Sequence, residues 1–157
     1  MGVEWTFLRP TGFAKNTLEW AEQIGAGGVI APYGAAARSL IDERDIAAVA
    51  VRALTEPGHA GKTYVLSGPE TVTQAEQVQI VGEEIGREVR WKEQSRADAR
   101  PAIVATFGSE EFADEALDTW EGFASEPEIV TSTVEEITGR PAHSFREWAG
   151  QHADEFR

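Results

Sequence analysis

A short apolar segment that ends at a proline limits the folds open to this chain. From Val3 to Leu8 the sequence reads Val-Glu-Trp-Thr-Phe-Leu. β-branched and aromatic residues dominate this segment, which is typical of a β-strand. Pro10 cannot donate a hydrogen bond to a neighbouring strand, and Thr11-Gly12 favours a turn, so we expect the strand to stop there. Open α/β sheets bind ligands beyond the carboxyl ends of their strands. The loop that follows is therefore a candidate binding site.

After this strand, helix signals and strand signals alternate. Helices are predicted over residues 17–24, 42–54 and 73–85, the second with Asp42 as its N-cap and the third with a capping box of Thr73 and Glu76. Short strands are predicted over residues 39–41, 62–67 and 89–92, and residues 26–34 read as a loop with a short extended piece. This alternation with short connections predicts an α/β fold with three to four short strands.

From Arg96 onward the sequence contains helix signals only. Ser109, Ser132 and Ser144 each precede a predicted amphipathic helix, which brings the expected number of helices in the chain to about six. No linker divides the chain. We therefore expect a single partial domain over residues 1–157, with a remnant of a sheet in residues 1–93 and a helical, substrate-side lobe in residues 94–157.

The charge of the chain argues against a nucleic-acid partner. The 157 residues carry a formal net charge of −13, whereas a phosphate backbone is bound by clustered Lys and Arg. No apolar run approaches the roughly 20 residues that a membrane helix needs, and no secretory leader follows Met1. The absence of cysteine excludes disulfides and fits a reducing compartment. We expect a cytoplasmic protein that binds neither nucleic acid nor membrane.

No catalytic motif stands out in the sequence. A G-x-S-x-G elbow is missing, and neither Tyr33 nor Tyr64 has a lysine four residues later, so a Tyr-x-x-x-Lys proton-transfer pair cannot form within this chain. Asp42 and Asp45 are explained by capping and by the helix dipole. The three histidines lack the spacing of metal ligands. We therefore predict no catalytic residue and no metal site.

Residues around the turn after Pro10 form a candidate ligand site. Asn16 and Tyr33 offer directed hydrogen bonds, and Phe13 and Trp20 offer aromatic walls, which is the usual make-up of a small-molecule pocket. We expect Phe13, Asn16, Trp20 and Tyr33 to bind substrate. The alternative is that the polar groups of this loop only satisfy backbone carbonyls.

Four segments of the chain, in order, carry a resemblance to a known family. The first is Trp5-Thr6-Phe7-Leu8-Arg9-Pro10 with Phe13 and Asn16. The second and third run from Ser39 to Ala47 and from Gly61 to Glu70, and the fourth is Gly-Arg-Pro-Ala-His-Ser-Phe-Arg-Glu-Trp over residues 139–148. Together they resemble the carboxyl-terminal half of the NmrA-like family of atypical short-chain dehydrogenase/reductases, and the fourth is similar to the closing motif of these proteins. The resemblance spans nearly the whole chain.

The resemblance implies the carboxyl-terminal portion of a Rossmann-like fold that binds NADP or NAD. It places Pro10, Thr11, Gly12 and Phe13 beside the nicotinamide, and it makes the helices after Val89 a substrate-side lobe. The family's glycine-rich phosphate loop, its first five strands and any Tyr/Lys pair belong to a first half without a counterpart here. We therefore expect a truncated product or one piece of a divided chain, without a pyrophosphate site of its own.

Three functions stay open at this point. The chain is the substrate-side portion of an NAD(P)H-dependent reductase that is catalytically incomplete alone, or a non-catalytic NAD(P)-sensing regulator, or a self-associating interaction module. A sheet that lacks strands leaves edges unpaired. Besides a small-molecule substrate or effector, we therefore expect either a homo-oligomer or a complementing amino-terminal half as partner.

Overall fold

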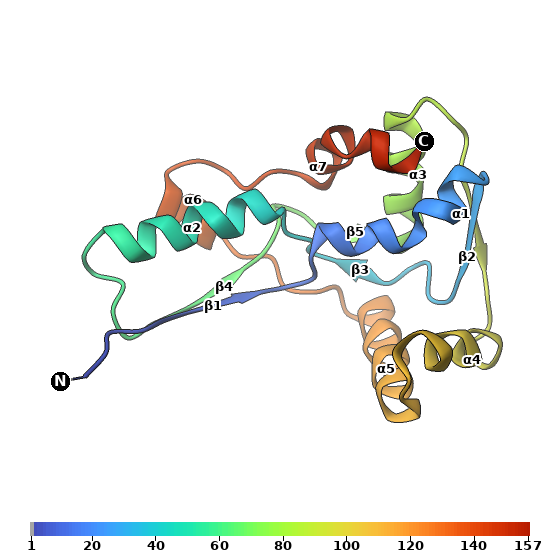
Figure 1. The fold of residues 1–157 in the computed structure, drawn as a ribbon, viewed down its shortest axis with the longest axis horizontal. Coiled ribbons are helices and arrows are strands. Elements are labelled where there is room, and N and C mark those ends of the chain that lie inside the picture. The colour runs from blue at the N-terminus through green and yellow to red at the C-terminus, as the bar shows by residue number, and fades with distance from the viewer. Residues whose placement is uncertain (1) are drawn as a thin grey trace.

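The computed structural model describes residues 2–157. The chain forms an elongated body from which a pair of helices projects (Figure 1). One end of the body contains β1 (Thr6–Pro10), β4 (Lys62–Leu66), α2 (Glu43–Thr55) and α6 (Thr133–Thr138). The other end contains α1 (Ala21–Gly25), β2 (Gly28–Ala31), α3 (Gln74–Glu84), β6 (Arg90–Glu93), α7 (Phe145–Gln151) and a 3-10 helix η2 (Ala153–Phe156). The projection is formed by α4 (Arg96–Phe107) and α5 (Glu110–Ser125).

The strands of the described residues pair two by two. β1 pairs with β4 and β2 pairs with β6, both in parallel, while β3 (Ala37–Arg38) pairs with β5 (Val72–Thr73) in antiparallel register. The α/β class is confirmed, although residues 2–157 contain six short strands rather than the predicted three to four. The predicted strand over residues 39–41 is wrong, because β3 ends at Arg38 and Ile41 forms only a single bridge with Phe13.

The first strand ends at Pro10, as predicted, but it begins at Thr6 rather than at Val3. β1 includes Pro10, which lies opposite Leu66, and the next residue, Thr11, donates its N–H to the carbonyl of Leu66 over 2.8 Å. Neighbouring N–H groups of a strand point to opposite sides. The missing N–H of Pro10 therefore falls on the edge of β1 that faces away from β4, where it costs no ladder bond.

Helix starts follow the local sequence closely. Asp42 accepts a hydrogen bond from the backbone N–H of Arg44 over 2.8 Å, and Thr73 forms a capping box with Glu76. Ser144 and Glu147 form a second capping box at the start of α7. The predicted helix over residues 17–24 is instead a 3-10 helix, η1 (Ala14–Trp20), that continues into α1.

Two buried clusters hold the body together. The larger one brings residues from the start of the chain, Ile24 and Val29, against Phe145 and Trp148 of α7, while the smaller one packs Val134 of α6 under the β1–β4 pair. Thus α6 and α7 pack on the body, and only α4 and α5 project from it (Figure 1). The division into residues 1–93 and 94–157 stays a prediction.

Candidate functional site

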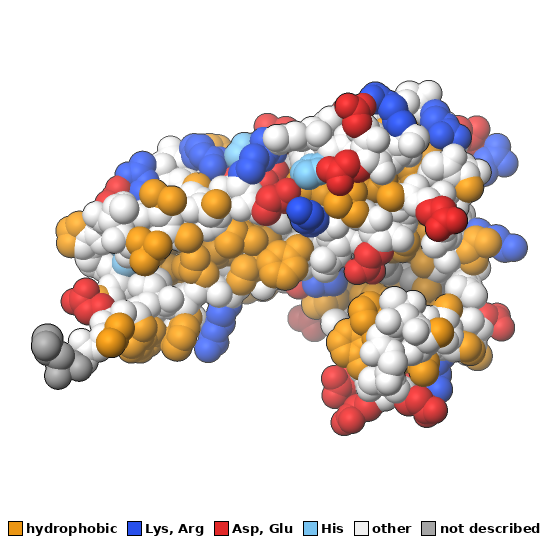
Figure 2. Space-filling model, viewed as in Figure 1, with side chains coloured by type: hydrophobic (Ala, Val, Ile, Leu, Met, Phe, Trp, Pro, Cys, Tyr) orange, Lys and Arg blue, Asp and Glu red, His pale blue; other side chains and the backbone are white. Residues whose placement is uncertain are grey.

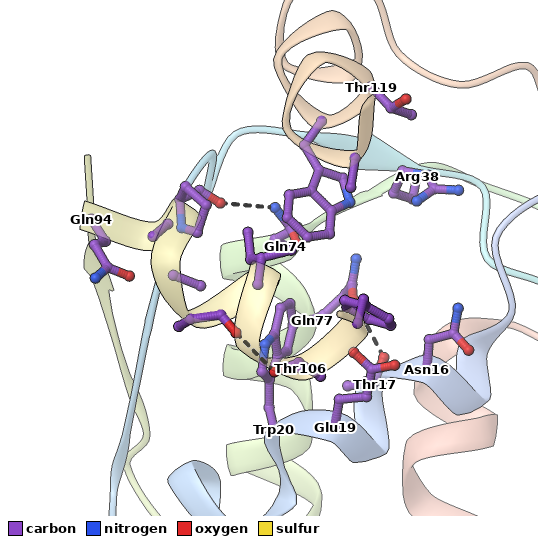
Figure 3. A pocket seen from close by; sticks show the side chains of 18 of the residues that line it. Asn16, Thr17, Glu19, Trp20, Arg38, Gln74, Gln77, Gln94, Thr106 and Thr119 are labelled. Carbon is purple, nitrogen blue, oxygen red and sulfur yellow. Dashed lines mark hydrogen bonds between the residues drawn. The ribbon is translucent and has the colours of Figure 1, made fainter. Parts of the chain in front are cut away.

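A cavity of about 870 Å³ lies between the body and the α4–α5 projection. Its floor comes from η1, β2, β3 and α3, and its roof from α4 and α5 (Figure 3). The loop after β1 leads into it, since Phe13 is part of the wall. This volume is in the range of small-molecule sites.

The roof of the cavity is mainly apolar and is lined by side chains of α4 and α5. Ser95 and Ser109 cap these helices, and Arg100 joins them through hydrogen bonds of 2.7 and 2.8 Å to the carboxylate of Asp114. The apolar side chains that line the roof are Ala99, Ala102, Ile103, Phe107, Phe112, Ala116 and Trp120.

Two glutamine amides of α3 contribute buried polar groups to the floor. Gln74 is 6% exposed and donates from Nε2 to the carbonyls of Pro32 and Tyr33 over 3.1 and 2.9 Å. Gln77 is 4% exposed and donates to the carbonyl of Val72 over 3.3 Å. Because its amide nitrogen is engaged, Gln74 is oriented, and its oxygen is the atom left to act as an acceptor. The oxygen of Gln77 already accepts a hydrogen bond from the hydroxyl of Thr17 over 3.4 Å.

The single cationic side chain among the described lining residues is Arg38, and its charge is compensated. Its guanidinium donates to both carboxylate oxygens of Glu128, over 2.9 and 3.1 Å, and lies 4.6 Å from the ring centre of Phe123. A bidentate pair of this kind holds the guanidinium in place. Arg38 is therefore part of the wall rather than a free anion-binding group.

Gly12 is required by the position of Arg38. A Cβ atom on Gly12 would lie 2.7 Å from Nη2 of Arg38 and 2.7 Å from a methyl group of Leu40. Both distances are far below a van der Waals contact. Glycine at this position is thus explained by close packing of the cavity wall.

Two carboxylates line the cavity without an ion pair among residues 2–157. They belong to Glu19 of η1 and Glu115 of α5. Partial burial at the cavity wall raises the pKa of Glu19 above its usual value. Figure 3 shows Glu19 next to Thr17 on the η1 side of the cavity. The uncompensated charge in this lining is therefore negative.

The structure brings three of the four predicted substrate residues together. Phe13, Asn16 and Trp20 all line the cavity. Tyr33 does not line it; this residue adopts a left-handed conformation (φ 58°) and donates its backbone N–H to the carboxylate of Glu93. The ligand roles of all four residues stay predictions.

The predicted nicotinamide-side residues are mostly engaged in the fold. Thr11 donates its hydroxyl to the carbonyl of Ser39 over 2.6 Å, and the carbonyl of Gly12 accepts from Ile41 over 2.8 Å. Pro10 pairs with β4, whereas Phe13 is 46% exposed at the margin of the cavity. Of the four, only Phe13 lines the cavity, and the cofactor role of the group stays a prediction.

Sequence reasoning missed Arg38, Gln74 and Gln77. For the glutamines a signal exists: they stand three residues apart on the face of α3 that also carries Val78 and Val81, all of them buried. Polar residues in line with the apolar face of a helix indicate buried hydrogen bonds. Arg38 has no comparable local signal, since its partner Glu128 is 90 residues away.

Asp45 has a role that capping does not explain. It is fully buried and accepts hydrogen bonds from Arg140 over 2.9 Å and from the N–H and Nδ1 of His143 over 2.7 and 2.8 Å. It therefore anchors the segment between α6 and α7 onto α2. This cluster lies outside the cavity.

The described residues offer neither a metal-binding cluster nor a membrane-spanning helix. Within residues 2–157 no group of three or more histidine or carboxylate side chains is arranged to hold a metal ion. None of the helices in this part of the chain has the length and apolar character needed to cross a bilayer.

Parallel strand pairs joined through helices, with a cavity entered from the loop after a strand, define a Rossmann-like α/β protein. The fold is shared with the NADPH-dependent quinone oxidoreductase of Escherichia coli, solved with NADPH, at a TM-score of 0.78 and 25% identity over 96% of this chain and 54% of that one. It is also shared with NmrA, a negative transcriptional regulator solved with NAD, at a TM-score of 0.64 and 15% identity over 96% of this chain and 53% of that one.

In sequence, the chain is 43% identical to (4-alkanoyl-5-oxo-2,5-dihydrofuran-3-yl)methyl phosphate reductase of Streptomyces griseus, over 99% of this chain and 55% of that protein. The chain spans about half the length of the curated relatives it matches. No family model matches it. Together the similarities confirm the resemblance to the carboxyl-terminal half of the NmrA-like atypical short-chain dehydrogenase/reductases.

Proposed function

We propose that this chain is the substrate-side portion of an NAD(P)H-dependent reductase. The observation that carries the proposal is the cavity of about 870 Å³ with an apolar roof, entered by the loop after β1 in a chain similar to the NADPH-dependent quinone oxidoreductase. Phe13, Asn16 and Trp20 of its wall contact the substrate, and Tyr33 acts from the neighbouring loop. Catalysis needs a complementing part, because no Tyr-x-x-x-Lys pair exists in this chain.

This chain contacts only the nicotinamide end of the cofactor in the proposed complex. The half-exposed ring of Phe13 at the cavity margin fits the flat face of a nicotinamide, and Pro10, Thr11 and Gly12 shape the backbone beside it. When bound, NADPH or NADH supplies the hydride. The role of these residues is to position the ring against the substrate and to exclude water. The pyrophosphate is held by the complementing part.

A complementing amino-terminal half also fits the exposed face of the β1–β4 pair. Parallel strands are normally covered on both faces. Here Trp5 and Phe7 are 48% and 51% exposed, with ring centres 4.6 Å apart, and Val65 of β4 is 38% exposed. Figure 2 shows exposed apolar side chains at the end of the body that carries the N-terminus. The alternative occupant is a second copy of the chain, as in a homo-oligomer.

We also propose that the protein is cytoplasmic, because a chain without cysteine fits a reducing environment.

The experiment compares the chain alone with the chain co-expressed with the amino-terminal half of the 43%-identical Streptomyces relative. Binding of NADPH and NADH is measured by calorimetry, and oxidation of NADPH is followed with a panel of quinones and carbonyl compounds. We expect binding and turnover only in the two-part sample. Failure of that assembled sample to bind either nucleotide would contradict the proposal.

A non-catalytic, NAD(P)-sensing regulator is the second candidate. The fold shared with the regulator NmrA and the lack of a Tyr-x-x-x-Lys pair in this chain favour it. The same experiment separates the two functions. Tight nucleotide binding without turnover of any compound in the panel would support the regulator.

A further inference from the structure

The electrostatics of the cavity restrict what it can bind. Its one cationic group, Arg38, is neutralised by Glu128 through two hydrogen bonds, while Glu19 and Glu115 have no cationic partner among the described residues. A phosphate or carboxylate that enters the cavity would meet negative charge without a free cation to offset it. Such a pocket disfavours anions and favours cations.

The polar atoms of the floor add a second restriction. The amide nitrogen of Gln74 is occupied by two backbone carbonyls. No fully buried side-chain oxygen or nitrogen of the described residues lacks a hydrogen-bond partner. Because no donor contacts Oε1 of Gln74, this oxygen retains access to the cavity. It offers a fixed acceptor, which requires a donor on the ligand.

We propose that the cavity selects flat, apolar compounds that carry a cationic or N–H-bearing group, and that Glu19 and Gln74 determine this specificity. The inference rests on the proposed function, because it makes this cavity the substrate site. The expected preference for a cationic ligand distinguishes the chain from its 43%-identical relative, whose name describes a phosphate substrate. The raised pKa of Glu19 agrees with a carboxylate that is partly withdrawn from water and gains from a cationic partner.

Three fluorescent probes with the same ring system test the inference on the unmodified chain. They are 9-(aminomethyl)anthracene as the cation, 9-(hydroxymethyl)anthracene as the neutral compound and anthracene-9-carboxylate as the anion. Fluorescence anisotropy at neutral pH and low salt measures each dissociation constant. We expect the cation to bind on the order of tenfold more tightly than the anion, with the neutral compound between them.

Substitutions of Glu19 then locate the effect. Because Glu19 is exposed on one side, Glu19→Gln keeps the fold, as circular dichroism checks. We expect Glu19→Gln to remove most of the preference for the cation without altering the affinity for the neutral probe, and Glu19→Lys to favour the anion. Glu22→Gln, one turn further along and outside the cavity lining, is the matched control and should change none of the three affinities.

The outcomes distinguish this inference from the proposed function. Equal affinity for cation and anion in the unmodified chain, or a preference that survives Glu19→Gln, would overturn the inference. If the cation preference is absent but the assembled two-part protein oxidises NADPH with quinones, the specificity inference fails and the reductase proposal stands. If the cation preference is found but the assembled protein binds no nucleotide, the proposed function fails and the binding specificity remains.

Discussion

The guanidinium of Arg38 donates two hydrogen bonds to the carboxylate of Glu128, from Nε to Oε2 over 2.9 Å and from Nη2 to Oε1 over 3.1 Å. The backbone N–H of Ser39 adds a third bond to the same carboxylate over 3.0 Å. This relationship joins β3 to the segment that follows α5. It closes one side of the cavity and removes the only positive charge from the described lining.

Glu128→Gln should weaken the fold and change the charge of the cavity. The glutamine cannot accept two charge-assisted hydrogen bonds from Arg38, so we expect a loss of about 1–3 kcal/mol in the free energy of unfolding, measured with urea. The released guanidinium should raise the affinity for anthracene-9-carboxylate. Glu88→Gln, which breaks a pair with Arg90 on the surface, is the control and should leave the urea midpoint unchanged. Equal midpoints for both variants would show that the Arg38–Glu128 pair is unimportant.

Gly68→Ala should be strongly destabilising. A Cβ at this position would lie 2.1 Å from the carbonyl oxygen of Leu40, so the backbone must move, at a cost of about 1–3 kcal/mol or more. Gly122→Ala in α5 is the matched control, since its Cβ meets no atom within 4 Å. Alanine there should stabilise the protein by about 0.5–1 kcal/mol. Thermal unfolding followed by circular dichroism measures both, and a Gly68→Ala protein as stable as the parent would contradict the packing described here.

Asp42 should contribute to stability at neutral pH but not in acid. Burial tends to raise the pKa of Asp42, but hydrogen bonds from the side chain and backbone N–H of Arg44 outweigh it and hold the pKa below its usual value. An acid with a lowered folded pKa stabilises the protein above its unfolded pKa of about 3.9. This stabilisation disappears as the pH falls through the lower folded pKa.

The measurement is the free energy of unfolding between about pH 6 and about pH 3. Asn is also a good N-cap, so Asp42→Asn preserves the start of α2 and should show a shallower fall in stability toward acid. Asp98→Asn on the exposed first turn of α4 serves as the comparison. An unchanged slope in Asp42→Asn would show that another group dominates the acid dependence.

Phe13→Ala and Asn16→Ala should each weaken binding of the neutral anthracene probe, by about threefold to tenfold, since both side chains line the cavity. In the assembled two-part protein, both variants should also reduce the rate of NADPH oxidation at low quinone concentration. Lys15→Ala changes the exposed residue between them, which does not line the cavity, and should behave like the parent. Unchanged affinity in both cavity variants would mean that the ligand binds elsewhere.

Local signals allowed five helices, α2, α3, α5, α6 and α7, to be placed from sequence, whereas α4 was missed and the start of the chain's first helical segment is the 3-10 helix η1. The N-cap at Asp42 and the capping boxes at Thr73 and Ser144 join residues two or three positions apart, so the hydrogen bonds that start these helices are present in the sequence itself. The alternation of strands and helices predicted the α/β class in the same way. Three of the four expected substrate residues reached the cavity because they follow β1 closely.

Most of the local elements and the position of the loop after β1 thus follow from short-range signals in the sequence. The register of β3, the neutralisation of Arg38 by Glu128 and the burial of Asp45 against His143 arise only in the folded chain. These contacts join residues 90 and 98 positions apart. The physical reason is that such pairs depend on how whole elements pack, and no short stretch of sequence contains both partners.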